Sequence, residues 1–169
     1  ARDLSTQKQT ATVTGNVKFV TDPTVGGCLQ FSGGHLMVPY NPKFAFTAND
    51  DFSLYAYVKP TKYTKQYAGI AQFARQTGSY YGIWIDPKNI YTIHPAFSKI
   101  TASPKWTSLL FIQKAGKRFL FINGKLSAQG AAKPATGKDG FYLGIGLPSE
   151  QFHGLIREVQ LYRRALSKQ

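Results

Sequence analysis

The chain has 169 residues, of which 43% are hydrophobic and 17% are charged. This composition excludes a disordered tail, a coiled coil and a collagen-like repeat, and we predict a single globular domain over residues 1–169. Lys and Arg number 21 against 8 Asp and Glu, and the net charge of +13 favours an anionic partner. The lone cysteine, Cys28, excludes an internal disulfide, and no apolar run is long enough to span a membrane.

Apolar and polar side chains alternate at every second position through most of the chain, which indicates β-strands. The expected strands are bounded by Gly, Pro, Asn or Asp and lie at residues 11–15, 27–33, 35–40, 52–58, 67–74, 79–86, 89–97, 107–114, 118–122, 126–128, 140–146 and 152–162. Only residues 41–46 and 163–169 are expected to form helical turns. Short strands with 16 Gly and 9 Pro predict an all-β fold, a two-sheet antiparallel jelly-roll sandwich.

Two strands carry a detailed prediction of which side chains face the core. In residues 52–58 the apolar set Phe52, Leu54, Ala56 and Val58 alternates with Ser53, Tyr55 and Tyr57. We therefore expect both tyrosines to face outward. After the strand at 118–122, the pair Asn123-Gly124 supplies the positive φ angles that a two-residue hairpin turn needs.

Four segments from about residue 26 to 168 resemble the laminin-G-like, concanavalin A-like jelly-roll family. They are GGCLQFSGGHLMVPY, DFSLYAYVKP, WTSLLFIQKAGKRFLFINGKL and FHGLIREVQLYRRALSKQ. The last is the most specific, and Tyr57 departs from the family pattern because Trp is usual at that position. The resemblance implies the concanavalin A-like fold and a role in glycan or protein binding, while the fold alone fixes no chemistry.

The carboxylates do not indicate a glycoside hydrolase, because no predicted strand carries the two closely spaced acids that this chemistry uses. The acids are Asp3, Asp22, Asp50, Asp51, Asp86, Asp139, Glu150 and Glu158, mostly in predicted turns. A polysaccharide lyase would use Tyr and His, but the offset of three between Tyr91 and His94 places them on opposite faces of a strand. We assign no catalytic residues.

Histidines and acidic residues are the candidate metal ligands. The three histidines are far apart in sequence and no acidic cluster accompanies them, so we expect no cofactor and no transition-metal site. Asp50 and Asp51 are the only calcium candidates, and the same residues suit a turn before a strand.

Cations and aromatic rings concentrate in the middle of the chain, where residues 52–138 hold thirteen Lys and Arg, Arg118 among them, and one acid, Asp86. Rings beside cations suit sugars or single-stranded nucleic acid. The ligand-binding candidates are Tyr55, Tyr57, Lys59, Lys62, Lys65, Arg75, Tyr80 and Trp84. Trp84 shares a face with Tyr80, whereas the face of Tyr81, Ile83 and Ile85 is more apolar and is expected to form core.

We therefore predict a non-catalytic, lectin-like module for an acidic or sulfated polysaccharide or glycan, outside the cell or on a cell or virion surface. The alternative is a basic assembly subunit of a ribonucleoprotein or virion that binds nucleic acid or an acidic protein. An intracellular location stays open. A lyase on an acidic glycan is the third candidate.

Overall fold

A computed structural model describes residues 8–73, 81–132 and 140–167 of the chain. Within these ranges the strands are β1 (Thr12–Asp22), β2 (Gly26–Val38), β3 (Phe52–Lys62), β4 (Ala68–Phe73), β5 (Tyr81–Ile85), β6 (Ile90–Ile93), β7 (Ala96–Thr101), β8 (Thr107–Lys114), β9 (Lys117–Ile122), β10 (Lys125–Ala131), β11 (Phe141–Leu143) and β12 (His153–Tyr162). A 3-10 helix, Pro42–Phe44, confirms the helical turn expected there, whereas residues 163–167 form none. The described segments contain no helix that could cross a bilayer.

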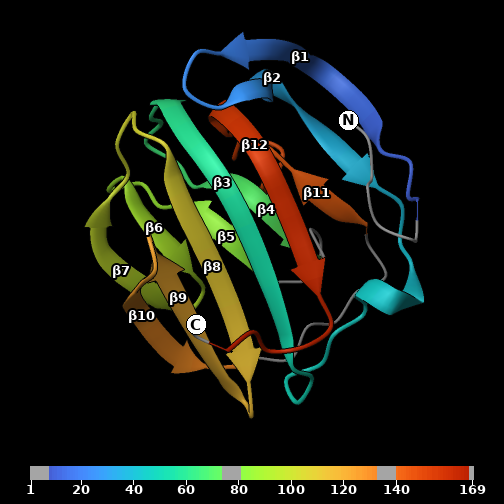
Figure 1. Cartoon of the computed structure of the whole chain (residues 1–169), viewed down its shortest axis with the longest axis vertical. Helices are drawn as coiled ribbons and strands as arrows, with labels where there is room; N and C mark the ends of the chain where they lie inside the picture. Colours follow the sequence, from blue (N-terminus) through green and yellow to red (C-terminus); the bar gives the residue numbers. More distant parts are fainter. Residues whose placement is uncertain (1–7, 74–80, 133–139, 168–169) are drawn as a thin grey trace.

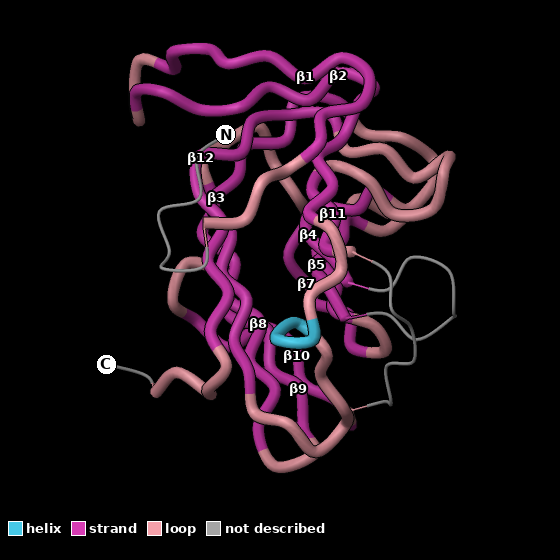
Figure 2. Tube along the Cα trace, turned by 90° about the vertical axis from the view of Figure 1, so that its right-hand side faces the viewer, coloured by secondary structure: helices cyan, strands magenta, loops and turns pink. Residues whose placement is uncertain are grey.

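The strands form two antiparallel layers that share one strand. Their hydrogen-bonded order is β10-β9-β8-β3-β12-β2-β11-β4-β5-β6-β7, with β1 added to β2. The first half of β2 pairs with β12 and its second half pairs with β11, so β2 passes from one layer to the other. Figures 1 and 2 show the first layer (β10, β9, β8, β3 and β12) facing the second (β11, β4, β5, β6 and β7). The predicted all-β antiparallel sandwich is confirmed.

The core fills the space between the layers with the side chains that the alternation predicts. Phe52, Leu54, Ala56 and Val58 are each 0% exposed. They face Tyr81, Ile83 and Ile85 of β5 among others, and these too are buried as expected. Full burial of a Leu, Ile or Phe side chain contributes roughly 1.5–3 kcal/mol, so burial of these side chains is the main favourable term in folding.

Tight turns close the β8–β9–β10 meander. Asn123 and Gly124 have φ angles of 48° and 75° and join β9 to β10, which confirms the predicted hairpin. Ala115 and Gly116, with φ angles of 48° and 72°, form the same kind of connection between β8 and β9. Asn and Gly tolerate this left-handed backbone at low cost, and Ala tolerates it less well.

Arg118, one of the thirteen cations of residues 52–138, lies inside the core. Arg118 is only 1% exposed, because it occupies the inward face of β9 together with Leu120 and Ile122. Its Nε donates to Oε1 of Gln113 at 3.2 Å, and its guanidinium carbon lies 4.4 Å from the Tyr81 ring centre. Burial lowers the pKa of this guanidinium. Arg118 therefore stabilises the interior and adds nothing to a binding surface.

Candidate ligand-binding site

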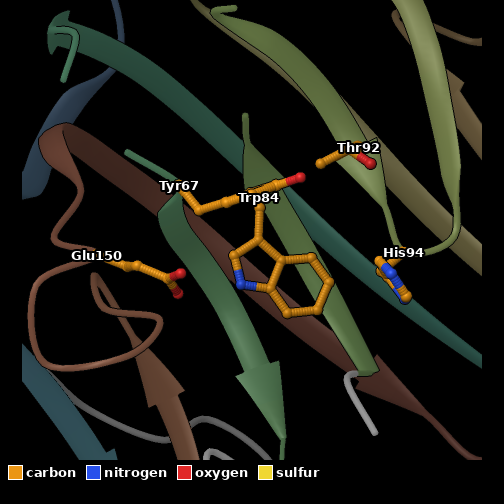
Figure 3. A pocket seen from close by; sticks show the side chains of 5 residues that line it. All are labelled: Tyr67, Trp84, Thr92, His94 and Glu150. Atoms are coloured by element: carbon orange, nitrogen blue, oxygen red, sulfur yellow. The ribbon is translucent and has the colours of Figure 1, made fainter. Parts of the chain in front are cut away.

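A pocket opens on the outer face of the second layer. Its volume is about 220 Å³, and its lining includes Tyr67, Trp84, Thr92, His94 and Glu150. In Figure 3 the indole of Trp84 lies between Glu150 on one side and His94 on the other. Small-molecule sites commonly occupy roughly 300–1,000 Å³, so this pocket suits a ligand about the size of a single sugar ring.

The sheet directs Trp84 into the pocket. Its neighbours Ile83 and Ile85 point into the core, so the indole points outward from β5. Trp84 lies opposite Gly69 of β4 and Thr92 of β6. The hydroxyl of Thr92 donates to the carbonyl of Ala96 at 2.8 Å, which fixes its orientation at the pocket wall.

A loop after β11 forms the opposite wall and rests on Gly69. A Cβ atom at Gly69 would lie 2.3 Å from the amide nitrogen of Gly146, so only glycine permits this approach. The amides of Gly69 and Gly146 both donate to the carbonyl of Glu150, at 3.1 Å and 2.8 Å. Oε2 of Glu150 accepts the amide of Leu147 at 2.7 Å. The carboxylate therefore stabilises the turn from Leu147 to Glu150 and also lies at the edge of the pocket.

Gln72 holds the indole in place from the neighbouring strand. Its Oε1 accepts the indole Nε1–H of Trp84 at 2.9 Å, and its Nε2 donates to the carbonyl of Gly146 at 3.1 Å. Gln72 is only 1% exposed, and both ends of its amide are bonded. The ring of Trp84 is thus fixed to the same loop that carries Glu150.

The lining combines an aromatic ring with groups that donate and accept hydrogen bonds. Burial, with a smaller effect from the carboxylates of Asp86 and Glu150, raises the pKa of Tyr67, so its hydroxyl keeps its proton at neutral pH. Glu150 supplies an acceptor and His94 a ring with two nitrogens. Trp84 is only 4% exposed, so the pocket offers a small part of the indole to the CH groups of a sugar ring, while the surrounding polar groups can bond to the hydroxyls of that ring.

The predicted platform residues lie on the other side of the molecule. Tyr55 and Tyr57 face outward from β3, as expected, and each is half-buried. The ring of Tyr57 lies 5.1 Å from that of Trp106 at an angle of 35°. Tyr55 and Trp84 therefore occupy outer faces of different layers, and the candidate residues form two groups instead of one surface.

The basic candidates have different environments. Lys59 Nζ lies 3.0 Å from Oδ2 of Asp22, so its charge is neutralised within the protein. Lys62 is exposed at the end of β3, and Lys65 is exposed two residues before Tyr67. Arg75 and Tyr80 lie outside the described residues.

The calcium candidates serve as turn residues. Asp50 Oδ2 accepts the amide of Thr47 at 2.6 Å, and Asp51 Oδ1 accepts the amide of Ala115 at 3.0 Å. The Nε2 group of Gln113 also donates to the carbonyls of Thr47 and Asp50, both at 2.8 Å. Among the residues that the structure covers, no three His, Cys, Asp or Glu side chains gather as a metal would require.

The two residues weighed for lyase chemistry lie apart, as their offset predicts. Tyr91 is 1% exposed in the core, and burial raises the pKa of its hydroxyl to about 12. His94 lines the outer pocket. A substrate in the pocket meets only one of them.

Sequence reasoning found Trp84 and missed its companions. Three separate segments carry Tyr67, Glu150 and the pair Thr92 and His94, and the pairing of β4, β5 and β6 brings them together. The only sequence signal was indirect: Thr92 and His94 lie on the face of their segment opposite Tyr91 and Ile93.

Solved structures with the same fold include toxin binding domains and a domain of an arabinanase. The binding domain of Paraclostridial Mosquitocidal Protein 1 matches 99% of this chain with a TM-score of 0.76 and 14% identity. The binding domain of botulinum neurotoxin DC in complex with SialylT matches 99% with a TM-score of 0.71 and 17% identity. This chain spans about half of either protein, 47% and 46% respectively.

Domain 4 of AbnA, an extracellular arabinanase from Geobacillus stearothermophilus in complex with arabinotriose, matches 94% of the chain and is itself covered to 84%, with a TM-score of 0.71 and 20% identity. A comparison with curated proteins found no match. The sequence itself matches a family over residues 32–169, most of its length. The chain belongs to the concanavalin A-like lectin/glucanase superfamily.

Proposed function

We propose that this protein is a non-catalytic glycan-binding domain that holds a sugar ring in the Trp84 pocket. The observation that carries the proposal is the pocket itself, in which a fixed indole lies among Tyr67, His94 and Glu150. The neurotoxin domain that was solved with SialylT and the arabinanase domain that was solved with arabinotriose support a glycan as the ligand class.

The net charge supports the finer proposal that the glycan carries acidic or sulfate groups. Glu150 in the pocket repels an anion, so the ring inside is an uncharged part of the ligand. Anionic substituents then lie outside the pocket, where the exposed Lys65 is a candidate partner. A glycan of this kind fits a domain that acts outside the cell or on a cell or virion surface.

The face of Tyr55, Tyr57 and Trp106 is the second candidate location for the same function, because two aromatic rings lie side by side there. Its cation Lys59 is already paired with Asp22, whereas the Trp84 pocket groups a hydroxyl, a carboxylate and an imidazole around one indole. The Trp84 pocket is therefore the better site.

The test begins with a glycan array at two salt concentrations, with heparin, alginate, carrageenan, arabinan and neutral glucans beside single-stranded RNA and DNA. The proposal expects binding to a limited set of glycans that persists at the higher salt. Binding to every polyanion that disappears with salt would replace the proposal with the basic assembly subunit.

The two tryptophans then identify the face that binds. The chain has only two tryptophans, Trp84 and Trp106, one on each outer face. The Trp106→Phe protein therefore keeps only the indole in the pocket, and the Trp84→Phe protein keeps only the indole on the other face. Titration with the selected glycan should change the emission of the Trp106→Phe protein and leave that of the Trp84→Phe protein unchanged. The reverse pattern would move the site to Tyr55 and Tyr57.

A matched pair of variants tests the chemistry of the pocket. Tyr67→Phe and His94→Ala should each weaken glycan binding about tenfold, as expected when a ligand loses one hydrogen bond. Lys88→Ala is the control, because this exposed residue lies in the turn between β5 and β6 and is absent from the pocket lining. Equal loss in all three variants would contradict the proposed site.

A further inference from the structure

β1 is the outermost strand of the fold, and within the described residues it pairs only with β2. Figures 1 and 2 both show it along the rim of the molecule. Most of its 11 residues are exposed. A strand of this length at an edge offers backbone N–H and C=O groups to a further strand.

Two large apolar side chains on this strand are uncovered. Val13 is 52% exposed and Phe19 is 75% exposed, the highest value among the exposed large hydrophobic side chains of the described residues. Val13 and Phe19 lie on the same face of β1 as Val17, which packs against the core. The apolar face of β1 therefore extends beyond the part of the core that covers it.

The strand is complementary to itself. β1 is irregular beside Asn16, because Gly15 has a φ of 72° and the register with β2 shifts between Gly15 and Val17. If the parts of β1 on either side of this irregularity run antiparallel to those of a second copy about a two-fold axis at Asn16, Val13 of each copy lies opposite Phe19 of the other. The same register places Lys18 opposite Thr14, so no like charges face each other. Directly opposite apolar pairs are the contacts that stabilise antiparallel strands.

Charge also favours this edge as the meeting point of two copies. The protein carries +13, and two copies repel each other over most of their surfaces. Residues 9–42, which contain β1 and β2, hold one basic residue, Lys18, and one acid, Asp22. This hairpin is therefore electrically neutral and lacks the repeated lysines that usually protect an exposed edge.

We propose that β1 pairs with β1 of a second copy of this chain, forming a two-fold dimer whose sheet runs continuously across the interface. The β2–β1–β1–β2 arrangement satisfies the free edge and covers Val13 and Phe19 of both copies. A dimer also carries two Trp84 pockets, which raises the avidity for a repeating polymer.

Sedimentation equilibrium over a range of protein concentrations tests the proposal. The unmodified chain should dimerise, and Phe19→Ser should weaken the dimer by at least about tenfold because the contact occurs twice in each dimer. Phe97→Ser is the matched control, since Phe97 is 48% exposed on β7. A chain that stays monomeric up to millimolar concentration, or equal effects of both variants, would overturn the proposal.

Disulfide trapping tests the register independently. Cross-strand pairs in antiparallel sheets have Cα atoms about 4.5–5.5 Å apart, within the range of a disulfide. Asn16→Cys should therefore form a covalent dimer under mild oxidation, because the two introduced cysteines face each other. Lys18→Cys should not, because residue 18 faces Thr14 of the second copy and the two cysteines lie apart along the strands. The native Cys28 is buried, so the unmodified chain gives the background level of cross-linking. Equal cross-linking of the two variants would show that β1 does not pair in this register.

Discussion

The ammonium of Lys59 on β3 lies 3.0 Å from Oδ2 of Asp22 at the end of β1, and the side chain of Asp22 is only 4% exposed. The other oxygen of Asp22 accepts the indole N–H of Trp106 at 3.1 Å and the amide of Thr24 at 2.9 Å. This carboxylate thus joins the edge hairpin to the first layer.

Acid should weaken this connection. The hydrogen bonds from Lys59 and from the Thr24 amide lower the pKa of Asp22 from 3.8 to about 2. Because the folded pKa lies below the unfolded one, the stabilisation is complete above about pH 4 and is lost as pH falls towards 2. Chemical denaturation of the native protein and of Asp22→Asn should show a stability difference that is constant from pH 7 to pH 5 and shrinks below pH 4. A difference that is independent of pH down to 2 would show that the ionised carboxylate contributes nothing.

Arg118 should be among the most costly side chains to remove. Arg118→Ala leaves a cavity between Tyr81 and Phe111 and removes the donor to the buried Oε1 of Gln113, so we expect a loss of about 3 kcal/mol or more. Arg118→Met fills most of the volume and should cost less. Arg157→Ala, at an exposed position on β12, is the control and should change the stability by less than about 0.5 kcal/mol. Urea denaturation measures all three, and similar small losses would mean that the guanidinium is not a core element.

Gly69→Ala should change the shape of the pocket by displacing the loop that forms one of its walls. The added methyl group meets the backbone of Gly146 at 2.3 Å, so the loop that carries Glu150 must move away from β4. We expect a stability loss of about 1–3 kcal/mol together with weaker glycan binding. Gly130→Ala on β10 is the control, since its nearest neighbour is a methyl group at 3.3 Å. Unchanged glycan binding by a folded Gly69→Ala protein would show that the loop carrying Glu150 does not contribute to the site.

The β9–β10 turn depends on Asn123 in two ways. Its φ of 48° is unfavourable for most residues, and its Oδ1 accepts the amide of Ser108 at 3.0 Å. Asn123→Ala should destabilise the protein by about 1–2 kcal/mol, since it loses the amide contact and also pays for the left-handed backbone. Asn123→Gly keeps the backbone freedom and isolates the contact to Ser108. Thermal unfolding that is identical for Asn123→Ala and the native protein would contradict this account.

The sequence predicted most of the fold because alternation and turn chemistry are local. Phe52, Leu54, Ala56 and Val58 fill the core as the pattern indicates, and Asn123-Gly124 forms the hairpin. Arg118 lies on the same face of β9 as Leu120 and Ile122 in the structure, although the sequence groups it with the cations of residues 52–138. Burial of an arginine becomes visible only when Gln113 and Tyr81 are seen around it.

The candidate site was predictable only in part. Trp84 stands out as one of two tryptophans, but Glu150 enters the pocket through a loop that rests on Gly69, 81 residues earlier in the chain. The pairing of Lys59 with Asp22 likewise joins residues 37 positions apart. No local pattern encodes such contacts, because they depend on the order of strands in the sheet.

The passage of β2 from one layer to the other links the unfolding of the two layers. Since β2 bonds to β12 through its first half and to β11 through its second, neither layer can separate without disturbing the same strand. The two layers therefore belong to one cooperative unit, and the amides of β2 that donate into either ladder should exchange their hydrogens with solvent only when the whole sandwich unfolds. Strands at the far ends of the sheet order, β7 and β10, can fray without that event and should exchange sooner.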